Sequence, residues 1–169
     1  IHFAMRFLIA FTSALLYLCG AAPSQPGTAT VCGDFSAYTN PNNGQTTCYL
    51  IQTGWKSWSE AETDCIQRGA HLASIHDDNF NSFLRNAARD AGIYDSFHIG
   101  LSDVNPGTSG FAWSDGSVLN YSNFGPGIPN INYGHCLYLQ IQKLPGLSSG
   151  MWFSEQCDGY SLPYGCTKN

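Results

Sequence analysis

Histidine, cysteine, serine and carboxylate side chains are the groups of this 169-residue chain that could bind a metal ion or perform catalysis. Zinc sites use spacings such as His-Glu-x-x-His or paired Cys-x-x-Cys, and neither occurs among the five histidines and seven cysteines. The sequence also has no local signature of Ser-His-Asp or Cys-His catalysis. Glu60, Glu62 and Asp64 are expected on an exposed helix face, where solvation explains them. We therefore predict that the chain is not an enzyme.

The cysteines point instead to disulfide bonds in an exported protein. Met5-Arg6 is followed by an apolar run over residues 7–18 and then by small residues, which is typical of a secretory signal peptide. We assign residues 1–22 to this signal and interpret residues 1–4, before the start Met, as upstream sequence. The apolar run is too short to span a bilayer, which needs about 20 apolar residues. We expect a secreted, extracellular protein without a membrane span.

Signal cleavage changes the cysteine count from odd to even. It removes Cys19 and leaves a linker over residues 23–31, a domain over residues 32–169 and six cysteines, for which 15 pairings are open. Acylation of Cys19 as in a bacterial lipoprotein is disfavoured, because Leu18 is bulky where a small residue is needed.

The charge balance excludes some classes of partner. Removing Arg6 from the seven basic residues leaves six against twelve acidic ones, a net charge of −6. Nucleic acids and anionic membranes favour clustered Lys and Arg, so neither is an expected partner.

The expected elements are two helices followed by strands. Ser57 and Glu60 have capping-box spacing before one helix, which ends at Gly69, and Asp77 or Asp78 can cap a second. The helix faces are Trp58, Ala61 and Cys65 in the first and Phe80, Phe83, Leu84 and Ala87 in the second; strands are expected over 48–51, 97–101, 136–141, 150–153 and 164–166. A long loop region rich in Gly, Pro, Asn and Ser covers residues 102–133. This order predicts an α+β domain.

These residues resemble the C-type-lectin-like domain over nearly all of residues 32–166. The matching motifs are Trp58-x-x-Ala61-x-x-x-Cys65, Gly69-Ala70-His71-Leu72-Ala73-Ser74-Ile75, Ile99-Gly100-Leu101, Trp113-x-Asp115-Gly116 and Cys136…Trp152…Cys157…Cys166. The resemblance implies a C-type-lectin-like fold, with two helices packed on antiparallel strands and three disulfides: Cys32–Cys48, Cys65–Cys166 and Cys136–Cys157. It also implies that His71 lies in a core strand and that His98, where relatives carry Trp, packs in the core. Its implied function is recognition, with carbohydrate binding as the usual role.

In the family, sugar binding uses a calcium ion, and the residues that would hold it are largely replaced here. The triplet Glu-Pro-Asn or Gln-Pro-Asp is Ile128-Pro129-Asn130, the following Glu is Gly134, and the Asn-Asp pair is Phe153-Ser154. In an accessory calcium site Asp103 matches, whereas Gly107, Ile131 and His135 occupy the other positions. Calcium needs anionic oxygen ligands, so we expect no cofactor and no calcium at the usual position. A shifted site near Glu155 and Asp158 stays open.

The resemblance places the ligand-binding surface in the long loop region. Its candidate residues are Ile128, Pro129, Asn130, Tyr133, Phe153 and Ser154. Their apolar side chains either form a contact patch or pack the loop, and we favour packing. Without an ion, the Ile128–Pro129 bond is expected to be trans or mixed.

The expected partner is a glycan, with calcium-independent binding of an extracellular protein as the alternative. The oligomeric state is not determined by the sequence. Asn120-Tyr121-Ser122 is an N-glycosylation sequon, which makes Asn120 a candidate modification site.

Overall fold

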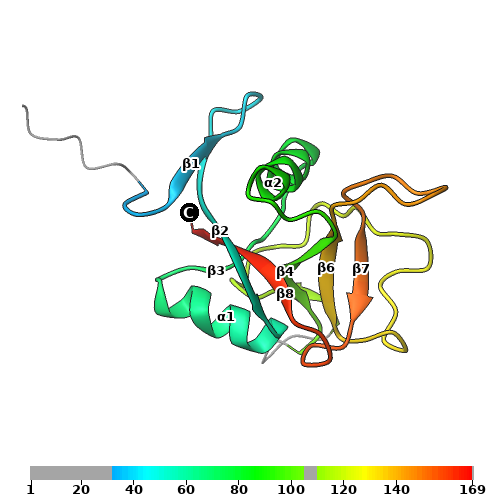
Figure 1. Ribbon diagram of the computed structural model, residues 1–169. Coiled ribbons are helices and arrows are strands. Elements are labelled where there is room, and N and C mark those ends of the chain that lie inside the picture. Colours follow the sequence, from blue (N-terminus) through cyan, green and yellow to red (C-terminus); the bar gives the residue numbers. More distant parts are fainter. Residues whose placement is uncertain (1–31, 105–109, 169) are drawn as a thin grey trace, which may run out of the picture.

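Eight strands form one sheet in the part of the protein that the computed structural model describes, residues 32–104 and 110–168 (Figure 1). The main path has the order β1-β2-β8-β4-β6-β7, with β3 paired to β8 and β5 paired to β4. The strands are β1 (Ser36–Thr39), β2 (Thr46–Lys56), β3 (His71–Leu72), β4 (Ser96–Ser102), β5 (Ala112–Trp113), β6 (Cys136–Gln140), β7 (Trp152–Glu155) and β8 (Leu162–Lys168). All pairs are antiparallel except β4 with β8, which is parallel at His98 and Tyr164, so the sheet is mixed. The expected signal peptide and linker lie outside the described residues.

The first helix, α1 (Trp58–Gln67), begins as its sequence predicts. The Ser57 side chain accepts from the Glu60 backbone N–H, and the Glu60 carboxylate accepts from the Ser57 N–H, which completes the capping box. Trp58, Ala61 and Cys65 are buried on one face.

The second helix, α2 (Asp78–Asp90), is capped by Asp77, and its buried face differs from the expected stripe. Asn81, Leu84 and Ala88 are buried with Phe80, whereas Phe83 and Ala87 are only partly buried. Asn81 tolerates burial because its side chain donates to the Gly150 carbonyl and accepts from the Trp152 indole N–H.

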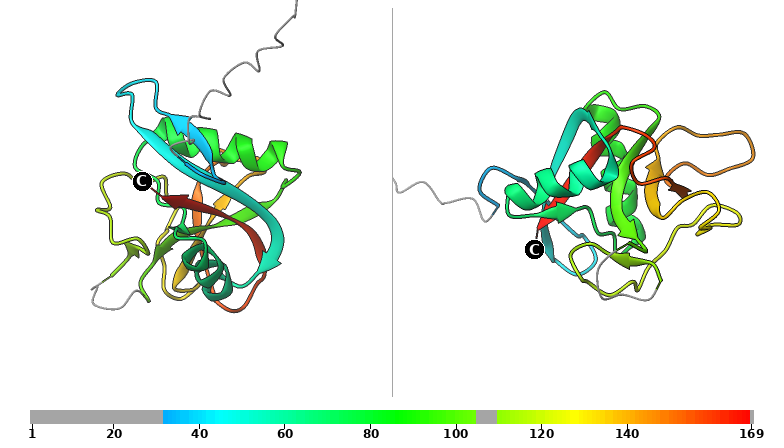
Figure 2. Two further views of the ribbon diagram at one scale, coloured as in Figure 1. Left: turned by 90° about the vertical axis from the view of Figure 1, so that its left-hand side faces the viewer. Right: turned by 90° about the horizontal axis from the view of Figure 1, so that it is seen from below.

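The two helices pack against opposite faces of β8 (Figures 1 and 2). Tyr164 and Cys166 share a buried cluster with α1 residues. Between them, Gly165 faces the Phe97 ring and the Leu84 side chain of α2. This alternation follows from the two-residue period of a strand.

The three disulfides implied by the resemblance are all present. They join Cys32 to Cys48, Cys65 to Cys166 and Cys136 to Cys157. Cys65–Cys166 ties α1 to β8 across 101 residues, and Cys136–Cys157 ties the start of β6 to the segment after β7. They therefore hold together segments that lie far apart in the sequence.

Aromatic residues anchor the long loop region to the sheet. The buried Trp152 ring makes edge contacts with Trp113, Tyr121 and Phe124, at centroid distances of 5.4, 5.7 and 5.5 Å. Phe124 also forms an isolated bridge with Trp152. Residues 113–124 are thus held around one buried tryptophan, as the aromatic content of the region predicts.

Candidate functional site

The fold brings the predicted ligand-binding residues of two distant segments together. The Asn130 backbone N–H donates to Ser154 Oγ over 3.0 Å, which joins the long loop region to β7. The Asn130 carbonyl accepts from the Tyr133 N–H over 3.0 Å, and its Oδ1 accepts from the Asn132 N–H. Asn130 is thus the centre of the turn that shapes this surface.

Two of the apolar candidates pack inward. Phe153 lies against Gly125, where a Cβ would come within 2.4 Å of its ring, and it stacks on Tyr138 at 5.8 Å. Ile128 is partly buried against the main core cluster. Phe153 and Ile128 thus pack the loop as the favoured interpretation expects, but that interpretation does not hold for Ile131 and Tyr133.

Two other side chains of the same turn point into solvent. Ile131 is 58% exposed and Tyr133 is 61% exposed, and Pro129 beside them is also exposed. We call Pro129, Ile131 and Tyr133 the loop surface.

Gly134 leaves no space for a side chain at the position where relatives carry a calcium-binding Glu. Its φ is +145°, and an added Cβ would lie 1.9 Å from the carbonyl carbon and oxygen of Glu155. The backbone therefore packs directly on β7, and the conformation seen here has no room for a side chain at residue 134.

The oxygens near this turn do not fit a calcium ion. Asn130 Oδ1 and Ser154 Oγ already accept backbone N–H groups, and neither oxygen is anionic. Calcium sites in proteins use several carboxylate and carbonyl oxygens at once. Within residues 32–104 and 110–168, no group of three or more His, Cys, Asp or Glu side chains is placed to hold a metal.

At the accessory position, Asp103 forms an ion pair instead. His135 Nδ1 lies 2.9 Å from Asp103 Oδ1. His135, which occupies the position of one accessory calcium ligand, is thus paired with Asp103, the ligand residue that this chain retains. Gly107 lies outside the described residues.

The expectation of a trans or mixed Ile128–Pro129 bond is wrong, because the bond is cis. The turn is held by hydrogen bonds within the protein: the Ile128 N–H donates to the Gly125 carbonyl, and the Asn130 N–H donates to Ser154. These bonds fix the backbone on both sides of Pro129.

His98 is buried as expected, but as half of an ion pair. Its side chain is fully buried, and Nδ1 lies 2.5 Å from Oε1 of Glu155, which is 4% exposed. Nε2 lies 2.9 Å from the Lys56 carbonyl oxygen. Because both ring nitrogens face acceptors, a proton must lie between His98 and Glu155. The same contact occupies one carboxylate oxygen of Glu155, one of the two acids considered for a shifted calcium site.

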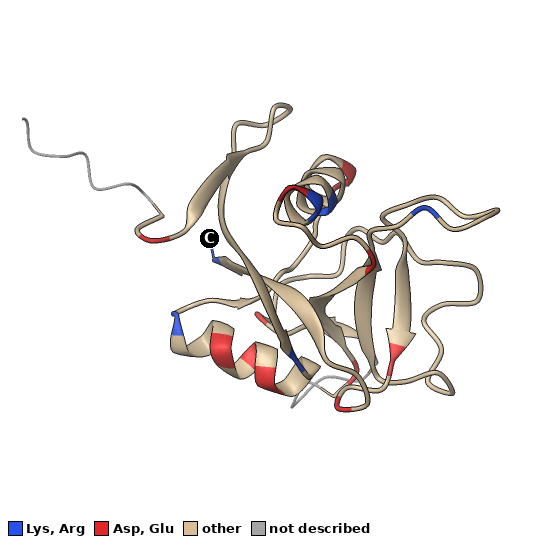
Figure 3. Cartoon of the chain, viewed as in Figure 1, with Lys and Arg blue, Asp and Glu red and all other residues tan. Residues whose placement is uncertain are grey.

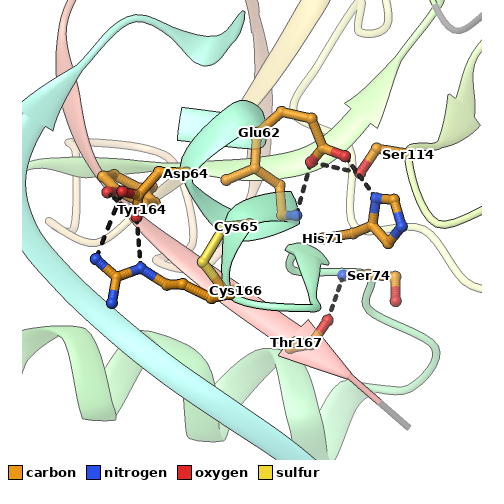
Figure 4. The surroundings of a disulfide bond; sticks show 11 residues. Glu62, Asp64, Cys65, His71, Ser74, Ser114, Tyr164, Cys166 and Thr167 are labelled. Carbon is orange, nitrogen blue, oxygen red and sulfur yellow. Dashed lines mark hydrogen bonds and ion pairs between the residues drawn. A yellow bond between two sulfur atoms is a disulfide. The ribbon is translucent and has the colours of Figure 1, made fainter. Parts of the chain in front are cut away.

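Glu62 is not simply solvated, and this expectation is wrong. Its carboxylate accepts from the Leu72 N–H over 2.8 Å and from the Ser114 hydroxyl over 2.9 Å, and it lies 2.6 Å from His71 Nδ1 (Figure 4). Glu62 joins α1 to β3 and to the loop after β5. The partly exposed His71 is its partner, so His71 is not a core side chain.

Asp64 also has a structural role. It accepts from Arg68 Nε over 2.7 Å and from the Tyr164 hydroxyl over 2.7 Å (Figure 4). The bond from Arg68 lowers the pKa of the Asp64 carboxyl, and burial raises the pKa of Tyr164 above its ordinary value. Two of the three carboxylates expected on the exposed face, Glu62 and Asp64, therefore tie α1 to neighbouring segments.

A Ser-His-Asn arrangement that the sequence motifs do not reveal lies beside the long loop region. His76 Nε2 is 3.1 Å from Ser117 Oγ, and His76 Nδ1 is 2.9 Å from Asn120 Oδ1. The Ser117 hydroxyl donates its proton to Asp115 Oδ1 over 2.5 Å, so His76 cannot accept that proton as a base. This geometry supports a polar network rather than an activated nucleophile. Asn120 is exposed, as a glycosylation site requires.

Asp115 gives the network a pH dependence. Burial raises the pKa of its carboxyl, but hydrogen bonds from Ser117 and Ser74 outweigh burial, and the pKa is lowered below its ordinary value of 3.8. A lowered folded-state pKa adds stability above the unfolded-state pKa, and this stability is lost as the pH falls through the folded-state value.

We expect Asp115→Asn to lower the free energy of unfolding by about 1–2 kcal/mol at pH 7. The deficit should shrink as the pH falls below about 4, because there the unfolded wild-type chain takes up a proton at Asp115 more readily than the folded protein does. Urea unfolding at pH 7 and pH 3 measures both. A deficit that is the same at both pH values would contradict the assignment.

Comparisons with known proteins agree with the fold. Residues 54–168 match the family model of the Lectin C-type domain. The chain is 35% identical over 121 residues to a Snaclec protein of Philodryas olfersii, an alignment that covers 70% of each chain. It is 39% identical over 87 residues to lactose-binding lectin l-2 of Anguilla japonica, covering 49% of this chain and 51% of that protein.

Solved structures share the fold. The carbohydrate-recognition domain of cow CD23, crystallised in the presence of a GlcNAc2Man3 oligosaccharide, aligns with a TM-score of 0.60 and 29% identity, over 73% of this chain and 88% of that one. The chain spans only 34% and 40% of two longer curated relatives. Among the described residues, no helix is both long and apolar enough to cross a membrane.

Proposed function

Because the chain belongs to the Lectin C-type domain family, whose members are recognition modules and not enzymes, we propose that it recognises its ligand without the family's usual calcium site. The proposed contact region is the loop surface, together with the neighbouring Asn130 and Ser154. Recognition then depends on side chains alone.

The observation that carries this proposal is the packing of Gly134 on Glu155. A Cβ at residue 134 would overlap the Glu155 backbone, so the backbone follows a path that a calcium-binding Glu could not share. Two acidic side chains considered as calcium ligands support the same view, because Glu155 is paired with His98 and Asp103 is paired with His135.

The proposed ligand is a glycan. The Tyr133 ring is exposed and can stack on the apolar face of a sugar ring, while the exposed Asn132 amide beside it can bond hydroxyl groups. The printed names of two relatives, a lactose-binding lectin and a carbohydrate-recognition domain, support this class of ligand.

A protein ligand is the second candidate. Ile131 and Tyr133 are close in the turn, largely apolar and more than half exposed. Aromatic residues are enriched at the energetic centres of protein interfaces.

We further propose that the protein is secreted. The sequence of residues 1–22 has the pattern of a signal peptide, and three disulfides are typical of proteins from oxidising compartments.

The decisive experiment is a glycan-array screen of residues 32–169 with intact disulfides, in millimolar calcium and in EDTA. We expect the same glycans to bind in both conditions. Tyr133→Ala and Ile131→Ala should each weaken binding about tenfold, or about 1.4 kcal/mol.

Ile66→Ala is the matched control, because Ile66 is 53% exposed but lies on α1. It should leave binding unchanged. Binding that disappears in EDTA would contradict the proposal. No glycan binding, with an EDTA-insensitive protein partner that Tyr133→Ala weakens, would favour the second candidate.

A further inference from the structure

Two exposed aromatic side chains lie in a groove at the opposite end of β4 from the loop surface. Trp55 is 70% exposed and Tyr94 is 68% exposed, and both line a groove of about 240 Å³ together with Asp95 and Pro163. The groove adjoins Ser96, which begins β4 and pairs with Gln140. The long loop region adjoins the other end, where Ser102 pairs with Cys136.

Trp55 reaches the groove because of an irregularity in the sheet. Gln52 of β2 pairs with Tyr164 and Lys56 pairs with Leu162, so three residues of β2 lie opposite Pro163 alone. Proline has no N–H to offer the ladder, and a bulge redirects the side chains of the strand that contains it. The irregularity thus leaves the large Trp55 ring exposed to solvent, so packing in the core does not account for a tryptophan at this position.

A second groove shares two residues with the first. Tyr94 and Asp95 also line a space of about 500 Å³ with Arg89, at the end of α2, and Lys143, in the segment after β6. The whole chain has only seven Lys and Arg residues. Figure 3, in which Lys and Arg are blue, shows basic residues on α2 and on the loop after β6. Neither Arg89 nor Lys143 forms a salt bridge with another described residue.

The two grooves therefore differ in charge: Asp95 is the one charged side chain that lines the first groove, whereas Arg89 and Lys143 outnumber that shared carboxylate in the second. On one side, aromatic faces and the Asp95 carboxylate favour a cation, and Trp and Tyr faces attract quaternary ammonium groups in particular. On the other side, Arg89 and Lys143 favour an anion such as phosphate.

We propose that this double groove binds a phosphocholine group. Its trimethylammonium lies between Trp55 and Tyr94 near Asp95, and its phosphate contacts Arg89 and Lys143. An anionic sugar is disfavoured, because the Asp95 carboxylate in the first groove would repel it. A lysine side chain of a protein ligand is disfavoured as well, because the basic Arg89 and Lys143 would lie next to it. A zwitterion with a short spacer satisfies both charge patterns.

The test is calorimetric titration of the disulfide-bonded protein with phosphocholine, choline and inorganic phosphate, in EDTA. We expect phosphocholine to bind, and choline and phosphate each to bind at least about tenfold more weakly, because each engages one groove. Trp55→Ala should weaken phosphocholine binding at least about tenfold, and Trp55→Phe much less. Tyr160→Ala, which removes a tyrosine of 65% exposure outside both grooves, should have no effect.

Three results would overturn the proposal. One is choline binding as tight as phosphocholine binding, and another is phosphocholine binding that Trp55→Ala leaves unchanged. An NMR spectrum in which phosphocholine does not move the Trp55 indole signal would overturn it as well.

Co-sedimentation with phosphatidylcholine vesicles tests whether the phosphocholine group that binds is a lipid headgroup. Co-sedimentation that free phosphocholine and Trp55→Ala both abolish indicates a lipid headgroup. Binding of free phosphocholine without co-sedimentation indicates phosphocholine carried on another molecule. Glycan binding at the loop surface should not change in Trp55→Ala, so failure of one proposal is distinguishable from failure of the other.

Discussion

His98→Leu is expected to lower the free energy of unfolding by about 3–5 kcal/mol, because it leaves a buried charge without its partner. Glu155 is 4% exposed, and its carboxylate oxygen lies 2.5 Å from His98 Nδ1. Without the imidazole, that carboxylate remains unpaired in the core. The Lys56 carbonyl also loses its hydrogen bond from Nε2. Chemical denaturation followed by tryptophan fluorescence measures the change.

The matched control is His71→Leu. His71 and Glu62 form the same kind of pair, with Nδ1 and Oε1 2.6 Å apart, but the His71 side chain is 40% exposed. Water can replace the lost partner there, so we expect a loss of about 1 kcal/mol or less.

A double variant tests the cause of the effect. His98→Leu combined with Glu155→Leu should recover at least half of the lost stability, because an apolar pair in place of a buried ion pair is often neutral or stabilising. A double variant as unstable as the sum of the two single variants would show that the packing of the ring, and not the unpaired charge, causes the loss.

Gly134→Ala is expected to cost about 3 kcal/mol or more. Two effects add at this position: a φ of +145° that side chains rarely adopt, and a Cβ 1.9 Å from the Glu155 carbonyl group. Neither can be relieved by rotation of a side chain, because the clash is with backbone. Thermal unfolding and denaturant titration of the variant provide the measurement.

Gly127→Ala separates the two effects. Gly127 has a φ of +74°, but an added Cβ would have nothing within 4 Å. It should cost about 1–2 kcal/mol, from conformation alone. Equal losses in the two variants would contradict the direct packing of Gly134 on β7.

The same geometry bears on attempts to restore a calcium site. Gly134→Glu would introduce the family's ligand where there is no room for its Cβ. We expect that variant to disturb the turn around Asn130 rather than to gain calcium binding. We therefore expect a calcium site here to need a different backbone conformation at residue 134 as well as different side chains.

The sequence by itself determined the features that depend on neighbouring residues. The Ser57–Glu60 capping box follows from local hydrogen bonding and backbone preference, and so does the cap of the second helix, which the sequence placed at Asp77 or Asp78. The number and order of the cysteines, read through the family resemblance, gave the correct disulfide pairs. The replaced calcium ligands were also visible in the sequence, because they are matters of residue type.

Only the tertiary structure decided which polar groups meet. His98 and Glu155 are 57 residues apart, and Glu62 lies 52 residues from Ser114, so no local pattern relates the members of either pair. Their pairing depends on the register of β4 against the other strands and on where α1 packs. The same holds for Gly134 on Glu155 and for Trp55 beside Tyr94. Periodicity indicates which face of an element is buried, but the partner that a buried charge finds depends on how distant segments come together in space.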